Sequence, residues 1–236
     1  MKAILLAAGK STRLKKTCRN TPKPMLKVKG EIILEHNLEW LIKFGVTEIY
    51  INLHYLPDVI KSHFKNGNAW DIQIKYAYEK NILGTAGGVK NMIKLYRHDD
   101  WEKDLLVVYG DNFYHSDYNI EEMKKFHLKK KALITIGFYH RKIDPHQGGI
   151  ALLDSNYKVK QFIEKPEKGE IKSDLVNAGI YLLNRKVLEY IPDGFSDFSR
   201  DIFPVLLKKK WPIYGYIFDK GLIPIDTPKL FLRANN

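Results

Sequence analysis

The pattern of apolar and polar positions switches repeatedly between two periods along the first 138 residues. Short apolar runs typical of buried strands alternate with longer segments in which apolar residues recur every three or four positions, as on one face of a helix. We therefore predict strands at 2–8, 48–53, 72–78, 104–109 and 132–138, and helices at 33–44, 85–95 and 120–129. A further helix begins at Pro57, and we expect Val59, Ile60 and Phe64 to face inward from it. Repeated βα winding predicts a mainly parallel sheet between two layers of helices.

The second half of the chain has a different pattern. Strands are predicted at 149–154, 159–164 and 175–183, with the turn residues Asp154, Ser155 and Asn156 forming a hairpin between the first two. A helix at 199–208, short strands at 214–218 and 222–225, and a last helix started by Thr227 and Pro228 follow. The pattern has no internal repeat and no linker, and we predict one α/β domain over residues 1–236 with a partly antiparallel second half.

Composition narrows the class of protein. The formal net charge of +12 raises nucleic acid as a partner, but the lysines are spread along the chain, and the runs 129–131 and 208–210 end predicted helices, where cations suit the helix dipole. We expect no nucleic-acid partner and no membrane partner, because no apolar run approaches the ~18 residues of a membrane span. The first residues form a strand rather than a signal peptide, which predicts a cytoplasmic protein. The single cysteine, Cys18, excludes an internal disulfide.

The segment after the first strand carries the first candidate chemistry. Gly9, Lys10, Ser11, Thr12 and Arg13 combine a bend poor in side chains with two hydroxyls and a permanent cation. Such a turn lets backbone N–H groups approach an anion, and Arg13 together with Lys23 of the rigid Thr-Pro-Lys-Pro stretch would neutralise it. The P-loop motif is excluded because Ile4 stands where its first glycine is required. The turn therefore predicts a polyphosphate site, with an ordinary tight turn as the alternative.

Further polar clusters follow predicted strands, where ligands bind in open α/β sheets. Glu79 and the glycine-rich 83–88 segment start a helix that suits a flat base or a phosphate, or else form a packing site. Asp111 follows an apolar strand and suits Mg2+, although such residues also cap turns. Asp226 is a second candidate metal ligand, with helix capping as the alternative.

Two clusters in the second half suit a phosphorylated acceptor. Lys165 at the end of the 159–164 strand would hold a phosphate, with Glu164 binding hydroxyl groups; the alternative is a surface ion pair before a turn. Asn177 lies inside a strand beside small residues and suits a sugar hydroxyl, or else makes a structural hydrogen bond at a bulge.

Seven of these motifs together resemble one known family. In order they are LAAGKSTRL, TPKPML, LGTAGG, YGDN, FIEKP, NAGIY and IDTP, and they extend over nearly the whole chain. The set resembles the sugar-1-phosphate nucleotidyltransferases, also called NDP-sugar pyrophosphorylases. The resemblance implies a Rossmann-like three-layer fold of the glycosyltransferase-A type. It also implies an activity that joins an NTP and a sugar 1-phosphate into an NDP-sugar with release of pyrophosphate.

The resemblance also implies a role for each matching residue. Arg13 and Lys23 would be catalytic, and Asp111 and Asp226 would hold Mg2+. The implied nucleotide-binding residues are Leu6, Ala7, Ala8, Gly9, Lys10, Ser11, Thr12, Glu79, Gly84, Thr85, Gly87 and Asp111. The implied sugar-phosphate residues are Asn112, Gly149, Glu164, Lys165 and Asn177. The reaction needs no protein nucleophile, because positioning and cations suffice for in-line attack on the α-phosphorus.

The chain departs from the family pattern at two places, and the substrate pair stays open. The Ile-Gly step normally found after the second metal-binding aspartate is missing after Asp226, and Lys10 and Ser11 stand where glycine is common. The motifs look most like guanylyltransferases for mannose or heptose 1-phosphate, which serve cell-surface polysaccharide synthesis. Uridylyl-, cytidylyl- or thymidylyltransferases and a non-catalytic NDP-sugar-binding regulator are the alternatives. We expect no left-handed helix of the kind found in acetylating relatives, and a homo-oligomer is compatible with the pattern.

Overall fold

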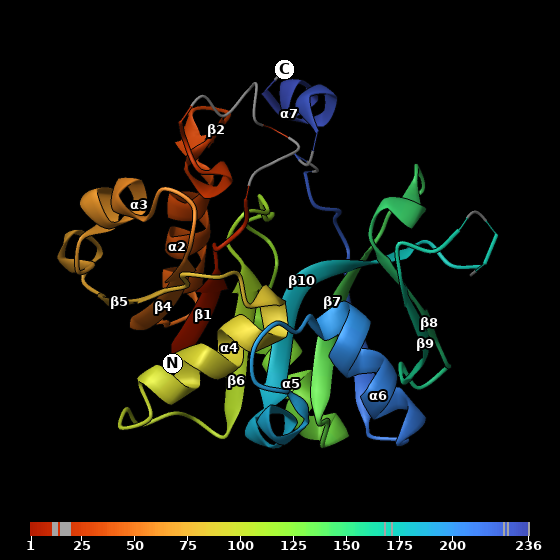
Figure 1. Cartoon of the computed structure of the whole chain (residues 1–236). Coiled ribbons are helices and arrows are strands. Elements are labelled where there is room, and N and C mark those ends of the chain that lie inside the picture. The colour runs from red at the N-terminus through yellow and green to blue at the C-terminus, as the bar shows by residue number, and fades with distance from the viewer. Residues whose placement is uncertain are drawn as a thin grey trace.

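A mixed sheet is the centre of the computed structural model, which describes residues 1–10, 14, 20–167, 169–170, 172–223, 225 and 227–235 (Figure 1). Within these residues seven strands follow one another in the order β11-β7-β10-β6-β1-β4-β5, and β8 and β9 extend the sheet from one end of β10. The strands are β1 (Lys2–Leu6), β4 (Glu48–Leu53), β5 (Gln73–Tyr78), β6 (Asp104–Tyr109), β7 (Ile134–His140), β8 (Gly149–Leu153), β9 (Val159–Glu164), β10 (Leu175–Asn184) and β11 (Ile213–Phe218). β10 runs antiparallel to β6 and β7, whereas the other neighbours along the main path are parallel.

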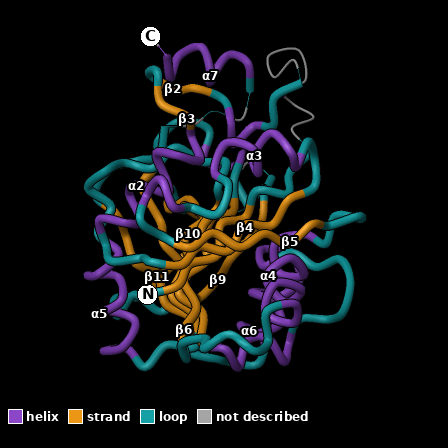
Figure 2. Tube along the Cα trace, turned by 90° about the vertical axis from the view of Figure 1, so that its left-hand side faces the viewer, coloured by secondary structure: helices purple, strands orange, loops and turns teal. Residues whose placement is uncertain are grey.

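Helices cover both faces of the sheet (Figure 2). The helices are α2 (Ile33–Lys43), α3 (Pro57–Phe64), α4 (Gly84–Leu95), α5 (Ile120–Lys130), α6 (Phe203–Lys208) and α7 (Pro228–Asn235). Apolar residues of α2, α3 and α5 pack on one face, which we call the α2 face, and those of α4 and α6 pack on the other, the α4 face. In the described residues no helix is long and apolar enough to cross a bilayer.

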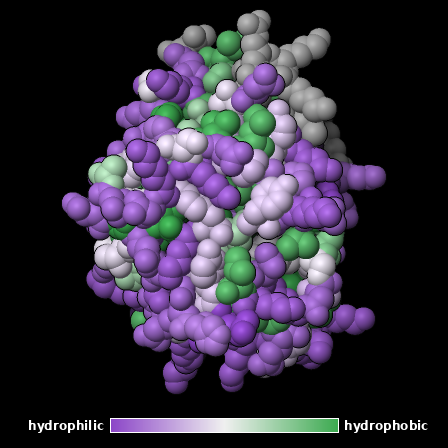
Figure 3. Space-filling model, turned by 60° about the vertical axis from the view of Figure 1, so that its left-hand side comes forward, coloured by the Kyte–Doolittle hydropathy of each residue, from purple (hydrophilic) through white to green (hydrophobic). Residues whose placement is uncertain are grey.

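A small third core lies beyond the top edge of the sheet. There α7 lies near the short hairpin of β2 (Lys27–Val28) and β3 (Glu31–Ile32) (Figure 1). Buried Val28, Ile33, Phe113 and Ala234 belong to this core. In the view of Figure 3 the outer surface is mostly hydrophilic, with apolar side chains confined to small patches, as suits a chain of net charge +12.

The structure confirms the predicted α/β class with a mostly parallel, partly antiparallel sheet, and it corrects four local expectations. Val59 does not face inward, because its side chain is 37% exposed. The strand expected at 222–225 is reduced, among the described residues, to one antiparallel bridge between Ile223 and Phe113. The helix expected at 199–208 begins with the π-helical turn Phe198–Ile202 before α6. The first strand ends at Leu6 rather than at residue 8.

The register of the parallel strands collects the candidate residues at one edge of the sheet. Leu6 at the end of β1 pairs with Asn52 on one side and with Tyr109 on the other. The next residues along each chain, including Gly9 and Asp111, therefore leave the sheet at the same level. In parallel sheets this edge, beyond the carboxyl ends of the strands, is where ligands bind.

A loop from far along the sequence fixes the start of α4. The carbonyl of Ser196 accepts hydrogen bonds from the backbone N–H groups of Ala86 (2.9 Å) and Gly87 (3.0 Å). The carboxylate of Asp197 accepts from the N–H and the hydroxyl of Thr85, both at 3.1 Å. These contacts satisfy donors that a helix start otherwise leaves without partners. The approach is close because a Cβ on Gly87 would lie 2.3 Å from the carbonyl oxygen of Gly194.

A half-buried polar cluster joins β4, β5 and the chain after α4 at the opposite edge of the sheet. Lys75 forms ion pairs with Glu48 (2.7 Å) and Asp99 (2.6 Å), and the hydroxyl of Tyr50 donates to both carboxylates. Burial raises the pKa values of Glu48 and Asp99, but the hydrogen bonds from Lys75 and Tyr50 outweigh it, so both pKa values lie below their ordinary values.

Replacing Lys75 by methionine tests this cluster through the pH dependence of stability. Because the folded-state pKa values of Glu48 and Asp99 are lowered, their stabilising effect is present above the unfolded-state pKa of about 4 and is lost as the pH falls through the folded values. We expect Lys75→Met to lower the free energy of unfolding by about 1 kcal/mol at pH 7. Urea unfolding between pH 7 and pH 3 should show the difference from the unsubstituted protein shrinking toward acid. Lys125→Met, at an exposed lysine of α5, is the control, and a pH-independent difference would contradict the assignment.

Replacing Gly87 by alanine tests the docking of the 194–197 loop on α4. Alanine favours a helix by about 1 kcal/mol over glycine, but its methyl group would meet the backbone of Gly194. We expect a net loss of about 2 kcal/mol in the free energy of unfolding, measured by urea titration. Gly9→Ala is the matched control, because a Cβ at Gly9 meets no atom within 4 Å. A stabilised Gly87→Ala protein would show that the loop is not held as described.

Candidate active site

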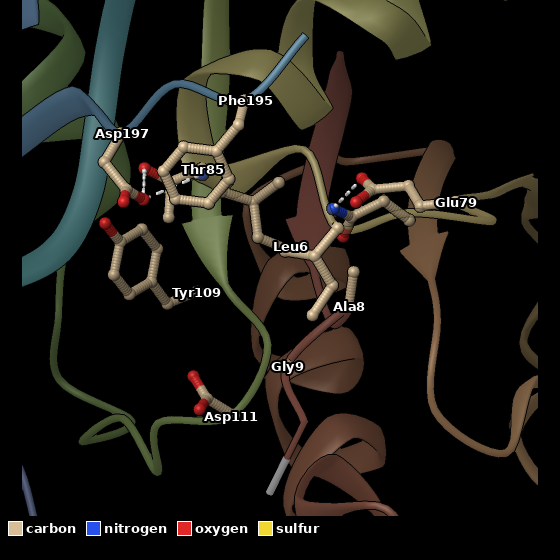
Figure 4. A pocket seen from close by; sticks show the side chains of 12 residues that line it. Leu6, Ala8, Gly9, Glu79, Thr85, Tyr109, Asp111, Phe195 and Asp197 are labelled. Atoms are coloured by element: carbon tan, nitrogen blue, oxygen red, sulfur yellow. Dashed lines mark hydrogen bonds between the residues drawn. The ribbon is translucent and has the colours of Figure 1, made fainter. Parts of the chain in front are cut away.

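A cavity of 320 Å³ opens at the edge where β1, β4 and β6 end (Figure 4). It is lined by Leu6, Ala8, Gly9, Asn52, Glu79, Ile82, Gly84, Thr85, Tyr109, Asp111, Phe195 and Asp197. Seven of these lining residues, from Leu6 to Asp111, are among those that the sequence implied for nucleotide binding. The cavity therefore brings together the opening turn, the glycine-rich segment and the strand-end aspartate.

Asn52 and Glu79 form the buried wall of this cavity. The side-chain carbonyl of Asn52 accepts the N–H of Ala7 (2.7 Å), and its amide donates to the Glu79 carboxylate (2.8 Å). Glu79 also accepts the N–H of Leu83 (2.9 Å) and is 2% exposed. Burial raises its pKa above the ordinary value, although the hydrogen bonds from Leu83 and Asn52 act in the other direction. Gly88 lets α4 pack against this pair, since a Cβ there would lie 2.8 Å from each side chain.

Lys23 and Asp111 form an ion pair on another side of the cavity. The Lys23 ammonium lies 3.0 Å from one carboxylate oxygen of Asp111. Lys23 sits in the 3₁₀ turn Lys23–Met25, which the flanking prolines favour, and it is 7% exposed. The side chain of Asp111 is 35% exposed. A half-exposed carboxylate with one oxygen directed at a cation keeps the other for a second cation, so the donor set at Asp111 fits Mg2+ bound jointly with phosphate oxygens.

The start of α4 is not open to a phosphate, although the sequence allowed one there. The N–H groups of Thr85, Ala86 and Gly87 are all hydrogen-bonded to the 196–197 segment. Gly84 has a φ of +72°, and a Cβ there would lie 2.5 Å from the Ser196 carbonyl oxygen. Gly84 and Thr85 thus line the cavity with a closely packed edge that fits a flat ring better than an anion.

Three of the predicted acceptor residues, Gly149, Glu164 and Asn177, lie on the α4 face of β8, β9 and β10. A Cβ on Gly149 would lie 2.7 Å from the Glu164 carboxylate, so these two residues touch. Lys165 follows directly, is exposed, and has a φ of +50°. Burial raises the pKa of Glu164, against the attraction of Lys165 and of Arg200.

Two asparagines predicted to contact the sugar phosphate make internal hydrogen bonds. Asn177 donates to the hydroxyl of Tyr181 (2.7 Å) and accepts the N–H of Gly179 (2.9 Å), which holds a bulge in β10. The structural alternative for this residue is therefore present in the fold. Asn112 donates to the carbonyl of Ala178 (3.1 Å). Direct contact of either side chain with a sugar stays a prediction.

A chain of hydroxyl groups connects the two halves of the site. Asn177 donates to Tyr181, whose hydroxyl donates to that of Tyr109 at 3.0 Å. Tyr109 lines the nucleotide cavity two residues before Asp111. Burial raises the pKa of Tyr109 and of Tyr181 well above the usual range, so both phenols stay protonated. Asn177 is thus held in a fixed relation to the cavity.

Some residues named in the sequence analysis are not among those that the structure describes. Ser11, Thr12, Arg13, Cys18 and Asp226 lie outside the described residues. Lys10 is exposed after the end of β1. Among the described residues, no group of three or more histidine, cysteine, aspartate or glutamate side chains is arranged to hold a metal ion. The role of the two aspartates as a metal pair stays a prediction.

Sequence reasoning did not single out Asn52, Phe195, Asp197 or Arg200. Asn52 carried a signal, because it is a polar residue inside an otherwise apolar strand and directly precedes its end. Phe195 and Asp197 carried none, since they reach the cavity only through a loop that contacts α4 across more than a hundred residues. Figure 4 shows the ring of Phe195 beside Thr85 and Leu6, and the residue is 62% exposed.

Comparison with known proteins shows which family the chain belongs to. The sequence model of the family described as nucleotidyl transferase matches residues 2–222. The chain is 34% identical to a UTP–glucose-1-phosphate uridylyltransferase of Synechocystis and 32% identical to a mannose-1-phosphate guanylyltransferase of Mycobacterium tuberculosis, each over 99% of this chain. It spans 62% and 63% of those two proteins.

A solved structure agrees with the sequence relatives. HddC from Yersinia pseudotuberculosis, complexed with GMP-PN, matches with a TM-score of 0.80 and 25% identity, over 99% of this chain and 97% of HddC. The sheet, the cavity at its carboxyl edge and the match over residues 2–222 lead to one conclusion: the chain belongs to the nucleotidyl transferase family.

Proposed function

We propose that the chain is a sugar-1-phosphate nucleotidyltransferase, which converts an NTP and a sugar 1-phosphate into an NDP-sugar and pyrophosphate. The observation that carries the proposal is the arrangement of Lys23 and Asp111 beside the cavity, with Asn177 connected to it through the Tyr109–Tyr181 pair. Relatives that match 99% of this chain are named for reactions of this kind.

The proposed reaction is an in-line displacement. A phosphate oxygen of the sugar 1-phosphate attacks the α-phosphorus of the NTP, the bond from that phosphorus to the bridging oxygen breaks, and pyrophosphate leaves. Lys23 would neutralise charge on the triphosphate, and Lys165 would hold the attacking phosphate. Asp111, with Asp226 as the sequence predicts, would hold Mg2+, which supplies further positive charge for the phosphate oxygens.

For the substrates we propose GTP with mannose 1-phosphate or heptose 1-phosphate. The guanylyltransferase relative and the HddC complex with GMP-PN support guanine. UTP with glucose 1-phosphate is the second candidate, because the relative of 34% identity is named a uridylyltransferase. The contacts of the cavity wall are compatible with either base, since both oxygens of Glu79 already accept hydrogen bonds from the protein.

A pyrophosphate-release screen tests the activity. We expect turnover when GTP, UTP, CTP, dTTP and ATP are crossed with mannose, heptose and glucose 1-phosphates in Mg2+, with the fastest rate for GTP. Asp111→Asn should reduce the rate about a hundredfold or more, because it removes the charge that faces the cations without changing the side chain's shape.

The exposed Asp58 of α3 provides the matched control, since Asp58→Asn makes the same chemical change away from the cavity. The control should keep full activity. Nucleotide binding without turnover for every pair would overturn the enzyme and leave the non-catalytic NDP-sugar-binding regulator. Full Mg2+-dependent activity in Asp111→Asn would remove Asp111 from the metal site.

Phe195 is a candidate contact for the nucleobase, because its anchored loop holds an exposed ring at the cavity. Stacking on an aromatic side chain is worth about 1–3 kcal/mol per base. We expect Phe195→Ala to raise the KM for the NTP about tenfold with little change in kcat, and Phe195→Tyr to restore the KM. Steady-state kinetics at saturating sugar 1-phosphate measure both. A fall in kcat of about tenfold with an unchanged KM would instead indicate that the substitution disturbs the fold of the loop.

A further inference from the structure

A second and larger cavity lies beyond the end of β7, beside α7. It has a volume of 670 Å³ and is formed by the loop after β7, the chain after β11, and α7. Its lining residues are Tyr139, His140, Arg141, Lys142, Ile143, Asp144, Gln147, Gly221, Leu222, Ile223, Thr227, Lys229, Leu230, Arg233 and Ala234. We call it the basic cavity. Its volume is within the range of small-molecule sites, about 300–1,000 Å³.

Strand register separates the basic cavity from the acceptor residues. Tyr139 of β7 pairs with Val176 of β10 and belongs to the core of the α2 face. The neighbouring Phe138 pairs with Asn177 and belongs to the core of the α4 face. Successive side chains of a strand point to opposite faces. The side chain of Tyr139, which lines the basic cavity, therefore points away from the face that carries Asn177.

The charge around this cavity is strongly positive and little compensated. Lys142, Lys229 and Arg233 are exposed and have no carboxylate partner among the described residues. Among the residues that the structure describes, the guanidinium of Arg141 donates only to neutral groups, the carbonyl of Ile143 (3.0 Å) and the side chain of Gln147 (3.3 Å). His140 is paired with Asp174, outside the lining.

Within the described part of the lining, four cationic side chains thus accompany one acidic residue, Asp144. Positive side chains that converge around a concave surface raise the local concentration of anions. Arginine in particular matches the geometry of phosphate oxygens.

The inner surface of the cavity is apolar. Tyr139, Leu222, Ile223, Leu230 and Ala234 supply it, and Ile143 stands at the wall with 78% of its surface exposed. A bare inorganic anion would leave this surface in contact with water. A ligand that carries a ring as well as an anionic group would cover it.

We propose that the basic cavity binds a small organic phosphate, with the phosphate held by Arg141, Lys229 and Arg233 and a sugar or nucleoside ring on the apolar surface. This is a site separate from the one that carries the proposed reaction, and its occupation requires no turnover. The size of the cavity and the combination of cations with an apolar floor define the ligand's chemistry. A sugar phosphate and a mononucleotide share that chemistry.

Isothermal titration tests the proposal in a Lys165→Ala background, in which the predicted acceptor phosphate contact is removed. The probes are inorganic phosphate, glucose 6-phosphate and AMP, added without NTP or Mg2+. We expect at least one organic phosphate to bind more tightly than inorganic phosphate. Adding Lys229→Ala and Arg233→Ala should weaken that binding about tenfold. Comparing glucose 6-phosphate with AMP then distinguishes a sugar ring from a nucleoside.

The control adds Lys125→Ala and Lys208→Ala, which remove the same charge from exposed positions on α5 and α6. This control should bind the probes as the background does. Equal weakening by the control would show a general charge effect, and equal affinity for all three probes would show that no ring is recognised. Either result, or no binding by the background protein, overturns the proposal. Because no nucleotidyl transfer is measured, these outcomes are independent of the proposed enzyme activity.

Discussion

The register between β1 and its two neighbours is the constraint on which the active site depends. Leu6, Asn52 and Tyr109 are paired across three parallel strands, and all three line the cavity, as do Ala8, Gly9 and Asp111 just beyond the ends of two of these strands. A shift of one residue would turn alternate side chains to the opposite face and separate Asn52 from the N–H of Ala7. The apolar runs in these strands set the register, since both faces of the sheet are covered by helices. The chemistry of the site is therefore a consequence of how a buried core packs.

Charge is distributed over the site according to burial. Glu79 is nearly inaccessible and accepts hydrogen bonds from two neutral donors, the amide of Asn52 and the backbone N–H of Leu83. Its role in the cavity wall is therefore to hold these two residues in place. Asp111 is more exposed and forms an ion pair with Lys23. Two acidic residues that line the same cavity thus differ in burial and in partners, and the metal-binding role of Asp111 stays a prediction.

The local sequence pattern was sufficient to predict most of the fold and part of the site. Period, turn residues and caps predicted the nine strands of the sheet and most helices, because those signals act over a few residues. The prediction that Val59 faces inward was wrong, because an apolar residue beside the apolar face of a helix does not have to be buried. Phe195 and Asp197 could not be predicted, because their positions follow from contacts with α4 that no local signal encodes. Of the two ligands that the sequence allowed at the start of α4, a flat base or a phosphate, the base is favoured for the same reason, since the N–H donors there are bonded to that distant segment.

The capping of α4 by residues 194–197 has a consequence for the order of folding. The helix begins Gly-Thr-Ala-Gly-Gly, and three glycines in its first turns make it a poor helix in isolation. Its donors find partners only after β10 and the turn that follows it are in place, which closes a loop of more than a hundred residues. Contacts of such long range form late, because the entropy of closing the loop is lost before the contact is gained. The cavity for the nucleotide is therefore complete only once residues 194–197 have docked on the start of α4.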